Sequence, residues 1–366
     1  MKFSETTSDG RNHRNPPWIE YPIDIVPSRS LGKLFNFSKI KSTDRGYTYG
    51  THYNGGSDSS LLKYYSTTLA GKTYSLESEV VTALIAHPDR FFEVRFQVSS
   101  KSSGCTAVCA GYELKEWRRK QLAGNLIKWL PEFALTYSEL SSLSAHNAAD
   151  LLAKAARSVY LSDKYKKRGE IGELLLHVIC REVFSTYPAI TKYFYKDSAN
   201  NTVKGFDSVH VVVTQTGLEL WLGESKFYEE VDKAINAAVK DLKAHTERDY
   251  MRAEFVTVRN MLDPSWPHAE KLKRLISPNV SLDTIFDAIC IPVLLTYNSN
   301  VIMSHTEVSA AFVKAFKEEV SKHYATFSSK NPLKDIKVHL FLFPAKDKTA
   351  LLDEFDERLK ACQAII

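Results

Sequence analysis

Two neighbouring segments in the second half of the chain carry carboxylates and an amine at spacings that suit metal-assisted hydrolysis. Asp207 lies in a predicted strand over 205–213, and Glu224 and Lys226 lie near the end of a second predicted strand over 218–227. Residues two apart in a strand point to one face, so Glu224 and Lys226 share a face. The other residues on these strand faces are apolar, so polar groups are predicted at the end of an apolar surface.

The connection between these strands fixes how they pair. A two-residue turn and a four-residue loop between Val213 and Leu218 give the same register. That register places Asp207 directly across from Glu224, with the Cβ atoms about 4.5–5.5 Å apart. Opposed like charges destabilise a strand pair unless something binds them, and Mg²⁺ takes oxygen ligands of this kind.

The amine beside these carboxylates has two interpretations. In a metal site, Lys226 can position a water or help to deprotonate it, and can offset charge on a phosphate. In an ordinary surface strand, Lys226 simply neutralises Glu224 or Asp207, and short motifs of this kind do occur without function.

A predicted helix over 170–185 adds more acidic side chains. Glu170, Glu173 and His177 follow one stripe of this helix, because residues three and four apart are helix neighbours. The ordinary interpretation is a solvated polar face, and no chemistry is assigned to His177. Gly172 costs a helix up to about 1 kcal/mol relative to alanine, which favours a close approach to the hairpin or to a ligand.

The wider pattern predicts an α/β protein in three parts. Residues 1–70 are polar, weakly periodic and irregular, 71–160 suggest a small α+β lead domain, and 161–366 alternate strands with helices. Alternation of this kind predicts a mixed sheet flanked by helices with a hairpin inside it. Helices are expected over 76–86, 113–130, 145–162, 170–185, 229–245, 308–327 and 348–364, and further strands over 91–98, 106–112, 288–297 and 336–343.

Composition limits the compartment and the ligand class. The N-terminus lacks the apolar core of a secretory signal, and no apolar run approaches the roughly 18 residues that span a bilayer. The five cysteines lack framework spacing, which favours a reduced compartment. A soluble cytoplasmic protein that does not bind membranes is expected. Clustered lysines and arginines suit a polyanion, although such clusters are often only solvated faces.

The order of these motifs resembles the PD-(D/E)XK nuclease superfamily, especially restriction endonucleases of the Mrr type, and more closely the HamA family, the nuclease subunit of Hachiman anti-phage systems. The resemblance covers about residues 105–366. Its motifs are Gly169-x-x-x-Glu173, Gly205-Phe206-Asp207, Glu224-Ser225-Lys226, the segment Lys167–His177, Trp117-Arg118 and Trp129–Leu135.

The superfamily pattern implies roles for these residues. Asp207 and Glu224 would hold Mg²⁺, for which Mn²⁺ is a possible substitute, with the Ser225 carbonyl as a third ligand. Lys226 would orient the attacking water, and Glu173 would complete the metal site. These implications add a restriction-endonuclease-like arrangement to the expected α/β fold.

Two details of the match leave choices open. Glu170 competes with Glu173 for the helix role, although the spacing from Gly169 favours Glu173. Phe206 replaces the proline of the superfamily's name, as is common in Mrr-like relatives.

The resemblance implies a metal-dependent DNA endonuclease that leaves 5′-phosphate ends and is controlled by a partner superfamily 2 helicase (HamB-like). The chain has no Gly-x-x-x-x-Gly-Lys-Ser/Thr phosphate loop of its own, and residues 1–70 and the lead domain over 71–160 are the expected docking candidates. The alternatives are a non-catalytic nucleic-acid-binding adaptor of the helicase and a self-contained restriction endonuclease. The intact set of four site residues speaks against the first. The lack of a recognisable helix-turn-helix or zinc module speaks against the second.

Overall fold

The computed structural model describes residues 65–69, 72–76, 87–100, 102–159, 169–191, 205–215 and 217–365. The chain divides into two compact units, 1–80 and 81–366. In the first unit the described part is an antiparallel hairpin of β1 (Tyr65–Leu69) and β2 (Lys72–Leu76). Most of the expected irregular segment and of the helix expected over 76–86 lies outside the described residues.

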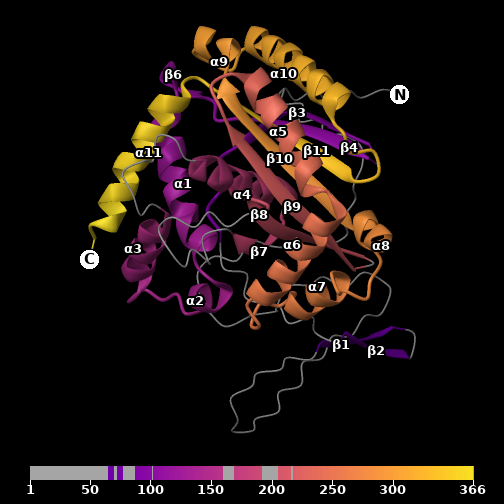
Figure 1. The fold of residues 1–366 in the computed structure, drawn as a ribbon. Coiled ribbons are helices and arrows are strands. Elements are labelled where there is room, and N and C mark those ends of the chain that lie inside the picture. Colours follow the sequence, from indigo (N-terminus) through magenta and orange to yellow (C-terminus); the bar gives the residue numbers. More distant parts are fainter. Residues whose placement is uncertain are drawn as a thin grey trace, which may run out of the picture. The chain divides into compact units, whose positions relative to one another are not determined.

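The second unit is built on a seven-stranded mixed sheet (Figure 1). Its central strands are parallel, and antiparallel strands complete both edges. In sheet order the strands are β3 (Glu93–Ser99), β4 (Ser103–Cys109), β11 (Lys337–Ala345), β10 (Ile289–Asn298), β9 (Gly217–Phe227), β8 (Ser208–Thr214) and β7 (Tyr187–Thr191). The expected mixed α/β sheet flanked by helices is confirmed, and β7 adds an edge strand that the sequence pattern did not indicate.

Strands β3 and β4 belong to this sheet rather than to a separate lead domain. Strand β4 pairs in parallel with β11, and Cys105 lies opposite Leu340. Six of the seven β4 residues are buried, as expected of a parallel strand covered on both faces. The domain boundary expected near residue 160 therefore falls inside one compact unit.

Helices cover both faces of the sheet. The first group along the chain is α1 (Arg119–Ala134), α2 (Tyr137–Ser141), α3 (Ala148–Val159) and α4 (Glu170–Phe184). The second group is α5 (Val231–His245), α6 (Arg248–Met261), α7 (Ala269–Leu275) and α8 (Leu282–Asp287). The chain closes with α9 (Asn300–Ser304), α10 (Ala310–Lys330) and α11 (Lys348–Gln363).

One helix begins later than its pattern suggests. A helix was expected from Glu113, but α1 starts at Arg119 because residues 112–117 form a short hairpin of β5 (Tyr112–Glu113) and β6 (Glu116–Trp117). Trp117 is buried and stacks on Phe343 of β11. This tertiary contact favours a strand at Trp117, and it outweighs the helical periodicity of the segment.

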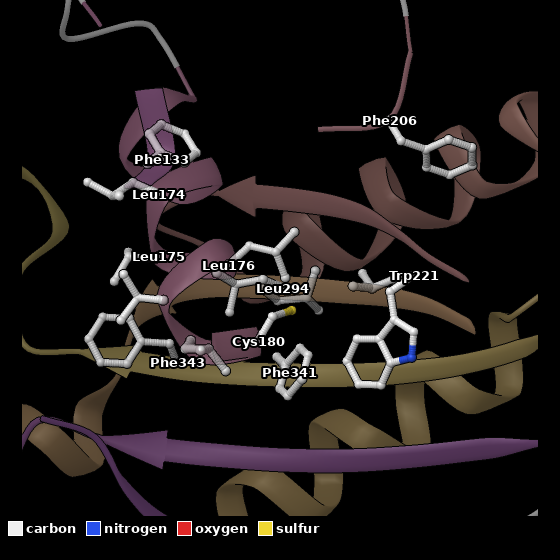
Figure 2. Close-up of a cluster of buried hydrophobic side chains, with 14 of the residues drawn as sticks. Phe133, Leu174, Leu175, Leu176, Cys180, Phe206, Trp221, Leu294, Phe341 and Phe343 are labelled. Atoms are coloured by element: carbon white, nitrogen blue, oxygen red, sulfur yellow. The ribbon is translucent and has the colours of Figure 1, made fainter. Parts of the chain in front are cut away.

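Helix α4 is the central helix of the unit and is buried almost all round. Figure 2 shows Leu176 and Cys180 of α4 directed at Phe341 and Trp221 of the sheet. The alternative interpretation of this stripe as a solvated polar face does not hold at His177, which is fully buried. That face of α4 packs against α1, where polar partners replace water.

A series of polar side-chain contacts links α1, α4 and β8. His177 Nε2 lies 3.1 Å from Glu132 Oε1, and His177 Nδ1 lies 3.2 Å from His210 Nε2. The Arg181 guanidinium donates to both Glu132 oxygens, at 2.7 and 3.2 Å. Burial alone would raise the pKa of Glu132, but His177 and Arg181 outweigh it and lower the pKa to about 2.

Buried histidines give the fold a predictable acid sensitivity. His339 on β11 lies 2.8 Å from Thr106 Oγ1, and burial, assisted by Lys337, lowers its pKa to about 4. The unfolded chain therefore binds a proton below about pH 6.5 that the folded chain refuses until lower pH. We expect the free energy of unfolding to fall by up to about 1.4 kcal/mol per pH unit from this group as pH drops from 6.5 toward 4.

Urea titrations at several pH values measure this slope. His339→Gln should reduce it, whereas the same substitution at the exposed His146 should leave it unchanged. An equal slope in the wild type and His339→Gln would contradict the prediction.

Candidate active site

The β8–β9 hairpin pairs in the predicted register as far as Ser208 and Gly223. The ladder runs from Thr214 opposite Gly217 to Ser208 opposite Gly223. It departs from the expectation one residue later, because the Asp207 amide donates to the Gly223 carbonyl at 2.8 Å. Asp207 and Glu224 lie at the same end of the hairpin, but they do not form a ladder pair.

The departure has a local cause in the turn before β8. The Phe206 amide donates to Glu254 Oε1 of α6 at 3.3 Å. A Cβ on Gly205 would lie 2.8 Å from both Glu254 carboxylate oxygens, so a larger residue there would displace the Glu254 side chain. Helix α6 thereby holds the turn away from a regular strand path.

The Asp207 carboxylate reaches across to β9. Its Oδ2 accepts hydrogen bonds from the Ser225 amide at 2.8 Å and from Ser225 Oγ at 3.0 Å. Both Asp207 and Ser225 are buried. This contact fixes the Asp207 carboxylate against β9 at the residue that follows Glu224.

Glu224 and Lys226 lie under α5 on one face of β9. Lys226 Nζ lies 2.5 Å from Glu224 Oε1 and 2.7 Å from Asp241 Oδ2. On the other side, His245 Nδ1 lies 3.2 Å from Glu224 Oε2. Glu224 is almost fully buried and Lys226 is half-buried, so these contacts are poorly screened by solvent.

The carboxylates around Lys226 keep its amine charged. Burial alone would lower the pKa of Lys226, but Glu224, Asp241 and Asp207 outweigh it and raise the pKa. Burial also opposes the charge on His245, and Glu224 and Asp241 raise its pKa nevertheless. Lys226 is therefore an ammonium at neutral pH, suited to holding a water or a phosphate oxygen.

Helix α4 approaches the opposite face of β9 through its glycine. A Cβ on Gly172 would lie 3.1 Å from Phe227 Cβ and 3.3 Å from Ser225 Oγ. This contact places the first turn of α4, with Glu170 and Glu173, against the end of the strand that carries the site. Glu170 is buried and Glu173 is half-buried.

The structure brings the predicted carboxylates together only in part. Within the described segments, no three or more His, Cys, Asp or Glu side chains are grouped as a metal ion would require. Asp207 and Glu224 lie at the same end of the hairpin, while Glu173 lies on α4, which packs on the other face of β9. The assignment of Glu173 rather than Glu170 to the site stays a prediction.

The close approach of α4 makes a glycine substitution informative. We expect Gly172→Ala to destabilise the protein by about 1–3 kcal/mol, as overpacking in a well-packed core does, despite the better helix propensity of alanine. Gly169→Ala is the matched control, because no atom of the described residues lies within 4 Å of a Cβ there. Thermal melts of both variants measure this loss of stability. An unchanged or raised melting temperature for Gly172→Ala would refute the tight contact.

Sequence reasoning missed the contribution of α5. Asp241 and His245 stand four residues apart, so they lie on the same side of the helix, and both contact the Glu224–Lys226 pair. The available indication was two titratable residues at helical spacing directly after a Glu-x-Lys strand. The same pattern is common on the solvated side of a helix, so it does not predict a contact by itself.

Comparison with known proteins places the chain. A family model described as HamA matches residues 86–359, which include the sheet, α4 and α5. The chain belongs to the HamA family. The expected family is thereby confirmed, and the match includes β3 as well as the later strands.

One curated relative is similar to this HamA chain. Anti-bacteriophage protein A of Escherichia coli (strain K12) is 22% identical over 259 residues, which are 68% of this chain and 46% of the relative. The chain thus spans less than half the length of that relative. No helix in the described part of the chain combines the length and apolar character needed to cross a membrane.

Proposed function

We propose that this protein is a metal-dependent DNA endonuclease that acts as the effector of an anti-phage defence system. The observation that carries the proposal is the hairpin end, where Glu224 and Lys226 are in contact and the Asp207 carboxylate binds the adjacent Ser225. Membership of the HamA family supports the defence role, as does the name of the anti-bacteriophage relative.

The donor set fits a hard divalent cation. Mg²⁺ is usually held by one or two carboxylates together with waters and substrate phosphates, and Asp207 and Glu224 are two carboxylates at one strand end. Glu173 and the Ser225 carbonyl are the further proposed ligands, and Mn²⁺ is a possible substitute. When bound, such a cation lowers the pKa of a water and polarises the scissile phosphate.

The chain's own residues supply the rest of the chemistry. The Lys226 ammonium orients the attacking water and offsets negative charge that develops on the phosphate. His245 and Asp241 hold Glu224 and Lys226 from α5. The hydrogen bonds from Ser225 fix the Asp207 carboxylate at the edge of the site.

A superfamily 2 helicase (HamB-like) is the proposed partner that restrains or releases the nuclease. The lead segment over 71–160 is a candidate docking region because it contributes no predicted site residue. Its strands β3 and β4 stabilise the nuclease sheet, so docking is assigned to the exposed surface of this segment.

Cleavage of supercoiled plasmid tests the proposal. Purified protein is incubated with Mg²⁺ or with EDTA, alone and with a HamB-like helicase. Metal-dependent nicking or linearisation that Glu224→Gln removes supports a nuclease. DNA binding without cleavage under every condition would support the adaptor instead, and cleavage at fixed sites without the helicase would support a self-contained restriction endonuclease.

A further inference from the structure

Lys226 has two carboxylate partners that come from different elements. Glu224 belongs to the same strand, and its Oε1 lies 2.5 Å from the Lys226 amine. Asp241 belongs to α5, and its Oδ2 lies 2.7 Å from the same nitrogen. The Lys226 side chain is 12% exposed and that of Asp241 is 34% exposed, so the pair lies at the solvent boundary of the site.

These two carboxylates differ in whether a bound metal would engage them. Glu224 is a proposed metal ligand, and a cation at its oxygens would repel the ammonium that occupies Oε1. Asp241 is outside the proposed ligand set. It is therefore an anchor for Lys226 that stays available when Glu224 is engaged.

The position of Asp241 is fixed by the packing of its helix. The adjacent Leu242 is buried, as are Ala234, Ile235 and Ala238 on the same side of α5. Near the end of the helix, the His245 ring stacks on Tyr250 at 4.7 Å between centroids and contacts the edge of Phe206 at 5.5 Å. Supporting contacts of this kind hold a site residue in one geometry.

We propose that Asp241 is a positioning residue that keeps the Lys226 ammonium beside the reacting phosphate while Glu224 binds the metal. This inference rests on the proposed nuclease function. Helix α5, which follows β9, thereby becomes part of the proposed active site. Asp241 has its role there through Lys226 alone.

A double-mutant cycle on the full chain tests this role. The proteins are wild type, Asp241→Asn, Lys226→Gln and the double variant, with Asp232→Asn at the exposed start of α5 as the matched control. The first readout is the affinity for Mn²⁺ without DNA, by calorimetry. The second is Mg²⁺-dependent plasmid cleavage, analysed as kcat and KM.

The expected results follow from competition at Glu224. Without Asp241, Lys226 rests on Glu224 alone and competes with the metal, so Asp241→Asn should weaken Mn²⁺ binding and lower kcat by about 10–100-fold each, with little change in KM. In the Lys226→Gln background, the same substitution should leave Mn²⁺ affinity unchanged. Asp232→Asn should match the wild type, and Asp241→Glu should recover part of the activity.

Other outcomes overturn the inference in distinguishable ways. If Asp241→Asn weakens Mn²⁺ binding equally with and without Lys226, Asp241 acts directly on the metal or on the fold, because independent effects add. If Asp241→Asn cleaves like the wild type, the anchor is not needed. A wild type that neither binds Mn²⁺ nor cleaves DNA refutes the proposed function itself. Should Asp241→Asn fail to fold, Asp241→Glu replaces it, and a loss of Mn²⁺ affinity in that variant contradicts the proposal.

Discussion

Lys226→Ala should reduce Mg²⁺-dependent DNA cleavage by at least about 100-fold, the scale on which a positioned proton-transfer or water-orienting group contributes. The side chain lies at the end of β9 with its amine between Glu224 and Asp241. Its removal deletes the ammonium but leaves the core of the sheet intact. Because Glu224 is buried and loses its ammonium partner, the melting temperature should also fall, so cleavage is compared at a temperature at which both proteins stay folded.

Plasmid nicking and thermal melts on the same preparation separate these effects. The matched control is Lys233→Ala on α5, where the lysine is 64% exposed and pairs with Glu230. That variant should cleave like the wild type, because this exposed lysine contacts none of the proposed site residues. Wild-type cleavage by Lys226→Ala would point to a contaminating nuclease or to a different site.

Glu132→Ala should destabilise the fold by about 3–5 kcal/mol, because breaking a buried ion pair leaves its partner charge uncompensated. Arg181 is buried and donates two hydrogen bonds to Glu132. His177, also buried, lies 3.1 Å from the same carboxylate. The substitution removes the polar contact between α1 and the central helix α4.

Urea unfolding at neutral pH gives the free energy directly. Glu270→Ala is the control, because this glutamate is 72% exposed in its pair with Lys273 and should change stability by less than about 1 kcal/mol. A loss below about 1 kcal/mol for Glu132→Ala would mean that Arg181 finds another partner, such as water, in the variant.

Much of the fold followed from local pattern. The alternation of strands and helices after residue 170 predicted β8, β9, α5, β10, α10, β11 and α11 close to their observed bounds. The hairpin register also followed, because the loop length between Val213 and Leu218 allows only one pairing of two alternating strands. These features depend on neighbours in sequence, which a single chain displays.

Features set by distant contacts were not predictable in the same way. Strand β4 pairs with β11 across more than two hundred residues, and no periodicity encodes that pairing. The burial of His177 depends on Glu132 and His210, each on another element. The path of Asp207 depends on Glu254 of α6, which holds the preceding turn.

The candidate site shows the same division. Glu224 and Lys226 were identified by their two-residue spacing, and the structure confirms that they share a face under α5. Asp241 and His245 join them only through the packing of α5 on the sheet. Sequence spacing gave the chemistry of the site, whereas tertiary packing decided which further side chains surround it.

The place of β11 in the sheet constrains how the protein is made. This strand lies between β4 and β10, yet it follows β4 by more than two hundred residues in the chain. Until residues 337–345 emerge, β4 has no parallel partner and β10 has an open edge. Because long-range pairing of this kind forms slowly, the sheet that supports the hairpin is completed only after residues 337–345 have been synthesised. A nascent or truncated chain would thus carry the site residues without the closed scaffold that positions them.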